Sequence, residues 1–119
     1  MKNSVLKPKS FDFGVIVVAV CQQLRNERKE FVLIKQLLRS GTAIGALVRE
    51  AEFGQSRADF INKMSIALKE ANETEYWIDL MKASGLLIPK KHAVVSTKVK
   101  ELIWLLIATV KTAKKNSEK

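Results

Sequence analysis

The side chains best suited to chemistry in this sequence are two glutamates and two arginines in its central third. Glu70 and Glu73 flank an apolar seam, and apolar neighbours on both sides favour partial desolvation of these carboxylates. A desolvated carboxylate stays charged only when cations or hydrogen bonds compensate it. Arg39 and Arg49 are the candidate cations. The sequence allows structural ion pairs, within one chain or across a subunit boundary. Structural ion pairing is the preferred interpretation, ahead of arginines that face a pore or groove and hold phosphates, and of charges that are simply solvated.

Groups suited to catalysis or metal binding are scarce. The chain has one histidine, His92, and no Glu-x-x-His pair, which argues against the di-metal carboxylate site of many helical bundles. The lone Cys21 lies in an apolar run without an adjacent base, so we expect a buried, inert thiol and no disulfide. Neither a serine elbow nor a glycine-rich phosphate loop is present. We therefore expect no enzymatic activity, no metal and no cofactor, and a solvated His92.

Basic side chains give the strongest functional signal. The formal net charge is +9 with a pI near 9.9, and residues 86–119 hold eight lysines and two glutamates. Such an excess favours polyanions, chiefly nucleic acid, although lysine-rich ends also serve solubility. The candidate nucleic-acid-binding residues are Arg39, Arg49, Lys90, Lys91, Lys98, Lys100, Lys111, Lys114 and Lys115. We find no aromatic residues interleaved with these lysines and no helix-turn-helix motif. Binding should therefore be backbone-directed, weakly sequence-specific and strongly salt-dependent.

The spacing of apolar residues predicts the helices that position these groups. A four-three alternation on each side of a tight turn at 53–55 is typical of an antiparallel helical hairpin. The alternation comprises Leu33, Leu37, Ser40, Ile44, Leu47 and Ala51 before the turn, and Phe60, Met64, Ala67, Ala71, Thr74, Ile78 and Met81 after it. In the turn we expect a left-handed Gly54, an N-cap at Ser56, and Asp59 reaching back to the N–H of that cap.

A second apolar seam of the helix before the turn contains Gly41 and Gly45. Each glycine inside a helix costs about 1 kcal/mol relative to alanine. Close packing of a neighbouring helix backbone is the natural reason to keep both glycines.

Two further helices are expected at the ends of the chain. Residues 13–21, FGVIVVAVC, have strand-like composition, but Phe13, Val17, Val20 and Leu24 keep a helical spacing. In the last segment the core stripe is Val95, Val99, Leu102, Leu106, Val110 and Ala113, with Ile103, Trp104 and Ile107 beside it. Apolar surface beyond the needs of one core predicts self-association.

The sequence therefore predicts a single all-α domain over residues 1–119, folded as an antiparallel up-down-up-down four-helix bundle that self-associates. The helices should span about 10–26, 30–53, 57–84 and 90–114, with residues 1–9 as a frayed arm and Gly85 as the stop of the third helix. The longest uncharged stretches fall short of the roughly 17 residues that span a bilayer, and residues 1–9 lack signal-peptide character. We expect a cytoplasmic protein without membrane contact.

One third of the chain carries a recognisable signature. It comprises residues 39–42 (RSGT), Gly45, 49–52 (REAE), 55–56 (QS), 59–60 (DF), 65–70 (SIALKE) and 73–77 (ETEYW). These residues resemble the 23S rRNA intervening-sequence proteins, a bacterial family of four-helix bundles that includes the S23 ribosomal protein family. This family is similar to the accessory variability determinant of diversity-generating retroelements.

The resemblance implies the four-helix fold, supports a helix at residues 13–21, and implies a homopentamer. It implies little about activity, because most of the family has no established function. Relatives often carry acidic residues where this chain has Lys90, Lys91 and His92.

The leading hypothesis is a non-enzymatic, homo-oligomeric bundle that binds RNA or DNA backbones without sequence specificity, as an accessory to a nucleic-acid process. The alternative is a structural or protein–protein interaction module without a nucleic-acid role, whose lysines serve solubility.

Overall fold

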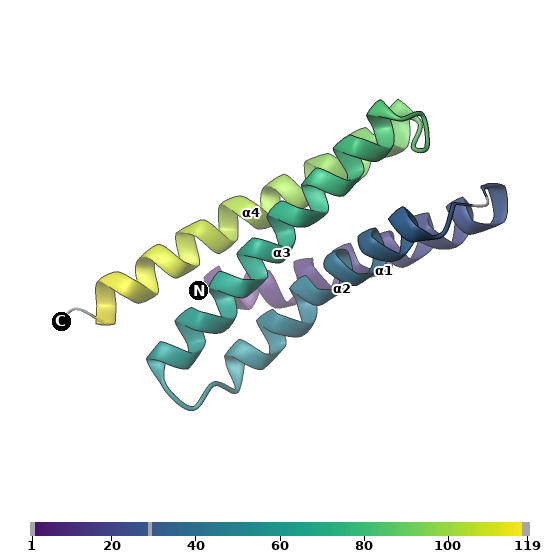
Figure 1. The fold of residues 1–119 in the computed structure, drawn as a ribbon. Helices are drawn as coiled ribbons and strands as arrows, with labels where there is room; N and C mark the ends of the chain where they lie inside the picture. The colour runs from purple at the N-terminus through teal and green to yellow at the C-terminus, as the bar shows by residue number, and fades with distance from the viewer. Residues whose placement is uncertain (1, 29, 118–119) are drawn as a thin grey trace.

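The computed structural model describes residues 2–28 and 30–117, and four helices make up nearly all of them (Figure 1). The helices are α1 (Lys2–Glu27), α2 (Val32–Glu52), α3 (Arg57–Ala83) and α4 (Pro89–Ser117). Each helix packs on the next along the chain, and α4 also packs on α1. The bundle is an elongated body of 51 × 21 × 20 Å. The described residues contain no strand, so the predicted all-α four-helix bundle is confirmed.

The core follows the predicted four-three alternation most closely in α3 and α4. The buried residues of these two helices include Met64, Ala67, Ala71, Thr74, Ile78, Met81, Val95, Val99, Leu102, Leu106, Val110 and Ala113. The strand-like run in α1 is helical, with Phe13, Val17 and Cys21 buried on one side. In α2 both seams contribute to the core, because Ile34 and Val48 are buried together with Leu37 and Ile44, and α2 packs on both α1 and α3. The described helices include none that is long and apolar enough to cross a membrane.

Helix α1 starts earlier than the sequence predicted. The expected start near residue 10 is wrong, because α1 runs from Lys2 and contains Pro8. The fully buried Leu6 anchors this first part of the helix to the bundle. Ser10 lies within the helix, and its hydroxyl donates to the Lys7 carbonyl at 3.2 Å. Burial of this leucine offsets part of the cost of a proline inside the helix.

The two glycines of α2 lie where α1 approaches most closely. A Cβ atom on Gly41 would lie 2.8 Å from both methyl carbons of Val17, and one on Gly45 would lie 3.2 Å from the Ser10 carbonyl oxygen. The prediction of close backbone packing is therefore confirmed at Gly45, whereas at Gly41 the close neighbour is the Val17 side chain and not the backbone of α1.

The turn between α2 and α3 forms as predicted in one respect and differs in two. The Ser56 hydroxyl caps α3 by accepting from the Asp59 N–H at 3.0 Å. The Asp59 carboxylate, however, accepts from the N–H of Gln55 at 3.3 Å rather than from that of Ser56. Gly54 does not adopt a positive φ. Glycine is needed there for space, because a Cβ would lie 3.1 Å from the Ala51 carbonyl oxygen and 3.2 Å from the Asp59 carboxylate.

The left-handed stop is instead at Gly85, which has a φ of +80°. The Leu86 N–H donates to the Met81 carbonyl at 2.8 Å, and the Gly85 N–H donates to the Lys82 carbonyl at 3.1 Å. These two bonds form a Schellman motif, so the predicted role of Gly85 is confirmed.

One polar contact crosses the buried seam between α2 and α3. The Thr74 hydroxyl lies 2.9 Å from the Ser40 hydroxyl, and both side chains are fully buried. Thr74 also donates to the Glu70 carbonyl within its own helix.

Candidate functional site

The predicted charged cluster forms between α2 and α3 within one chain. The Arg39 guanidinium contacts the Glu70 carboxylate at 3.1 Å and also pairs with Glu73. The two carboxylates are 17% and 31% exposed, which agrees with the expected partial desolvation. The Trp77 indole N–H donates to Glu73 at 3.2 Å. Of the interpretations left open, the structure places Arg39 in an intrachain ion pair.

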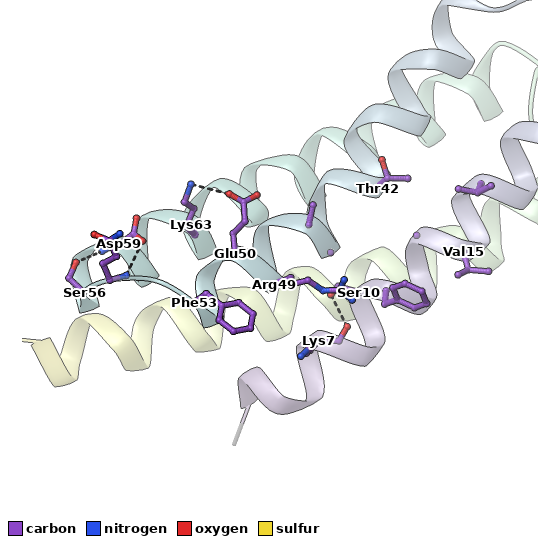
Figure 2. A pocket seen from close by; sticks show the side chains of 16 residues that line it. Lys7, Ser10, Val15, Thr42, Arg49, Glu50, Phe53, Ser56, Asp59 and Lys63 are labelled. Carbon is purple, nitrogen blue, oxygen red and sulfur yellow. Dashed lines mark hydrogen bonds and ion pairs between the residues drawn. The ribbon is translucent and has the colours of Figure 1, made fainter.

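Arg49 lies apart from that cluster. Among the described residues no carboxylate oxygen lies within 4.0 Å of its guanidinium. Arg49 instead lines a groove of about 1270 Å³ between α1 and α2, which reaches the start of α3 (Figure 2). The structure therefore separates the two arginines that the sequence grouped together.

The groove has an apolar wall that the sequence analysis missed. Phe11, Val15 and Val18 of α1 line it together with Phe53 at the end of α2, and all four side chains are exposed. A spacing of four and then three residues places Phe11, Val15 and Val18 on one side of α1. This spacing can be read from the sequence, but the core stripe that begins at Phe13 runs beside it along the same helix and makes the two hard to separate.

The charges at the groove are mostly neutralised. Lys63 lies 3.3 Å from Glu50 (Figure 2). Lys7, which also lines the groove, lies 3.1 Å from Glu52. The groove is thus an apolar surface with paired charges at its edges.

The lysines of α4 are mostly exposed and mostly unpaired. All are exposed except the half-buried Lys91. Only Lys100 has a carboxylate neighbour among the described residues, Glu75 at 4.0 Å. The single glutamate of α4, Glu101, accepts from Lys9 of α1 at 3.2 Å. Helix α4 holds seven lysines and one glutamate, a net charge of +6 that the bundle leaves largely uncompensated.

The lysines divide between different sides of α4. Lys91 and Lys98 are seven residues apart and share one side. Another side carries Lys100, Trp104, Ile107, Lys111 and Lys114, which again alternate by four and three residues. Trp104 is 67% exposed and Ile107 is also exposed. The view that no aromatic residue interleaves with the lysines is therefore wrong. The sequence placed Trp104 beside the core stripe of α4, whereas in the structure its side chain is exposed.

The remaining reactive groups have structural partners. His92 is only 13% exposed, and its Nε2 atom lies 2.7 Å from Asp79, so the expectation of a solvated histidine is wrong. Cys21 is buried as expected. Burial raises the pKa of its thiol to about 11, against a smaller opposing effect of Arg25. The described residues contain no group of three side chains suited to a metal ion.

Comparison with known proteins places the chain among related bundles. A family model described as 23S rRNA-intervening sequence protein matches residues 2–108. The chain is similar to a solved protein of unknown function from the S23 ribosomal protein family of Bacteroides thetaiotaomicron VPI-5482. The two are 51% identical, with a TM-score of 0.91 over 93% of this chain and 99% of that chain. No curated protein matches the chain.

Proposed function

Because this chain belongs to the 23S rRNA-intervening sequence protein family, we propose a function that its fold and charge can support without catalysis. The protein is a non-enzymatic, self-associating bundle of the cytoplasm that binds the backbone of RNA or DNA. It acts as an accessory to a nucleic-acid process. The solved relative is itself described as a protein of unknown function, so this proposal rests on the chain's own residues.

The observation that carries the proposal is the uncompensated charge of α4. Six of its seven lysines, all but Lys100, have no carboxylate oxygen within 4.0 Å among the described residues. A row of unpaired ammonium groups attracts phosphates and releases the counterions condensed on them. The same lysines paired with glutamates, as Lys63 is, would contribute little to such binding.

The two arginines receive different roles in this proposal. Arg39 is already bound to Glu70 and Glu73, so a phosphate would have to displace two carboxylates to reach it. Arg49 has no such partner among the described residues, but it lies at the groove of α1 and α2. Binding should therefore depend on the α4 lysines far more than on Arg39.

Self-association is assigned to the groove side of the bundle. Its apolar wall and its neutralised edges are suited to burial against a second copy of the chain. The resemblance to the retroelement accessory protein implies five copies.

Fluorescence anisotropy with labelled RNA and DNA over a salt series tests the proposal. Replacement of Lys111, Lys114 and Lys115 by alanine should weaken binding about tenfold or more at low salt. It should also reduce the slope of log affinity against log salt by about 2 to 3. Lys63→Ala is the matched control, because its ammonium group already has a carboxylate partner.

Two results would contradict this function. The wild-type protein could fail to bind either nucleic acid even at low salt. Alternatively, the triple variant and the Lys63→Ala control could bind equally well, in which case the α4 lysines serve solubility.

A further inference from the structure

We infer that one side of α4 binds single-stranded nucleic acid, with a base stacked on the Trp104 indole. This stacking face is defined as Lys100, Trp104, Ile107, Lys111 and Lys114. The inference rests on the proposed function and deepens it, because it names single strands rather than duplexes as the ligand.

The first support is the contrast between the two tryptophans of the chain. Trp77 is half-buried, its N–H donates to Glu73, and its ring meets that of Tyr76 edge-on at 5.2 Å. Trp104 is 67% exposed, and its side chain makes no hydrogen bond to the described residues. A large, rigid ring with an open π-face is the platform on which single-strand-binding proteins stack bases.

The second support is the position of lysines on both sides of that ring. Lys100 lies one turn before Trp104, and Lys111 lies two turns after it on the same side of the helix. The face from Lys100 to Lys114 is about 21 Å long, because an α-helix rises 1.5 Å per residue. A nucleotide stacked on Trp104 would therefore have the unpaired ammonium group of Lys111 on one side, and on the other side that of Lys100, whose 4.0 Å contact with Glu75 a phosphate would have to displace.

The geometry favours a single strand over a duplex for a simple reason. Bases in a duplex already stack on one another, so an indole on a helix surface finds no free base to cover. Inserting the ring between paired bases would require unstacking them. The lysines of the face contact phosphates in either ligand, so only the single strand gains from Trp104.

A second copy of the chain is the competing occupant of this face, and charge argues against it. Two copies packed face to face through this surface would bring their lysines together, since the face carries three lysines and no acidic residue. A ring of five joins two different surfaces at each interface, so for that arrangement the molar mass of the Trp104→Ala variant is the deciding measurement. The stacking face also borders α3, where Lys100 meets Glu75. The apolar groove lies on the α1–α2 side of the bundle, where Lys7 and Lys63 are already paired and Arg49 is the one cation of the described lining without a carboxylate within 4.0 Å. The groove can therefore be covered by another copy of the chain while the stacking face of α4 stays free to bind a single strand.

The test compares a labelled single strand of about 12 pyrimidine nucleotides, within known single-strand site sizes, with a duplex of the same length. Trp104→Ala should weaken single-strand binding about tenfold and change duplex binding less than twofold. Trp104→Phe should keep most of the single-strand affinity. Phe31→Ala removes an aromatic of comparable exposure, 56%, at the start of α2, and should change neither affinity.

A direct readout is the fluorescence of Trp104 in a Trp77→Phe variant, where it is the sole tryptophan. Binding of the single strand should quench this emission, and the duplex at equal saturation should not.

The outcomes separate this inference from the function on which it rests. If Trp104→Ala weakens both ligands equally or neither, the inference is overturned, while binding that still depends on Lys111 and Lys114 leaves the proposed function intact. If Trp104→Ala lowers the molar mass in solution without changing the preference for single strands, the face is an interface between copies and the inference fails. If the wild-type protein binds neither ligand, the proposed function itself falls.

Discussion

Arg39 shows how a single side chain can support two helices at once. It joins α2 to two carboxylates of α3, and Arg39→Ala leaves Glu70 and Glu73 without this cation. Because both carboxylates are partly buried while the arginine is about half exposed, we expect a loss of about 1 kcal/mol in the free energy of unfolding. Urea denaturation followed by circular dichroism measures it.

Arg49→Ala is the control for that experiment, with an expected change within about 0.5 kcal/mol, because no ion pair of the described residues involves it. Equal effects of the two variants would show that the Arg39 pairs contribute no specific stability.

Cys21 gives a residue-scale prediction about pH. Its thiol has a pKa of about 11 in the folded chain against an ordinary value of 9.0, because burial penalises the thiolate. The folded state therefore holds this proton more tightly than the unfolded state does. The resulting stabilisation is complete below pH 9 and is lost as the pH rises toward 11. Denaturation midpoints of wild type and Cys21→Ala should converge over this window. Parallel pH profiles of the two proteins would refute the assignment.

At the scale of helices, we expect opposite changes in stability when Gly41 and Gly14 are each replaced by alanine. Gly41→Ala places a methyl group 2.8 Å from the stiff, buried Val17, so overpacking of about 1–3 kcal/mol outweighs the helix-propensity gain of about 1 kcal/mol. Gly14→Ala meets nothing within 4 Å and should stabilise α1 by up to about 1 kcal/mol. Thermal unfolding of both variants measures the difference.

Shortening the opposing side chain checks the cause. Gly41→Ala combined with Val17→Ala should be less destabilised than the sum of the two single changes, because the added methyl group then occupies the vacated space. Additive losses would mean that the close approach of α1 and α2 is not what requires Gly41.

The same scale explains which elements could be predicted from the sequence. The alternation in α3 and α4 was sufficient because each helix buries one narrow stripe, as at Met64 or Val99. The start of α1 was not predictable, because local signals such as Pro8 argue against a helix, and the burial of Leu6 against the bundle follows only from the tertiary packing. Gly54 was misjudged because its requirement is for space beside Asp59 and not for a backbone angle.

The candidate site was harder to predict than the fold, for a physical reason. A groove between α1 and α2 depends on how two helices pack, and the spacing of Phe11 and Val15 alone does not reveal that Phe53 joins them. The pairing of Arg39 with Glu70 likewise required the relative alignment of α2 and α3. The α4 lysines could be recognised at once, because charge density is a property of the sequence itself.

For the whole molecule we expect a mass in solution of about five times the 13.4 kDa of one chain, as the family resemblance implies. Val15→Glu puts a charge in the centre of the apolar wall of the groove and should shift the protein toward the monomer in size-exclusion chromatography with light scattering. Val94→Glu is the matched control, because Val94 has nearly the same exposure and lies on α4, away from the groove. A monomeric wild type, or equal shifts in both variants, would reject the groove as the interface.

The hydroxyl pair of Ser40 and Thr74 has a consequence for the axial alignment of α2 and α3. If α3 slipped by one turn along α2, the two hydroxyls would no longer meet, although each keeps a carbonyl acceptor in its own helix, Leu37 for Ser40 and Glu70 for Thr74. Apolar residues recur at every turn of this seam and tolerate such a slip, so the contact between the two oxygen atoms favours one alignment over its neighbours. Replacing both by apolar side chains should therefore leave the melting temperature nearly unchanged. The NMR spectrum of that variant should show more than one set of backbone amide signals, one for each alignment.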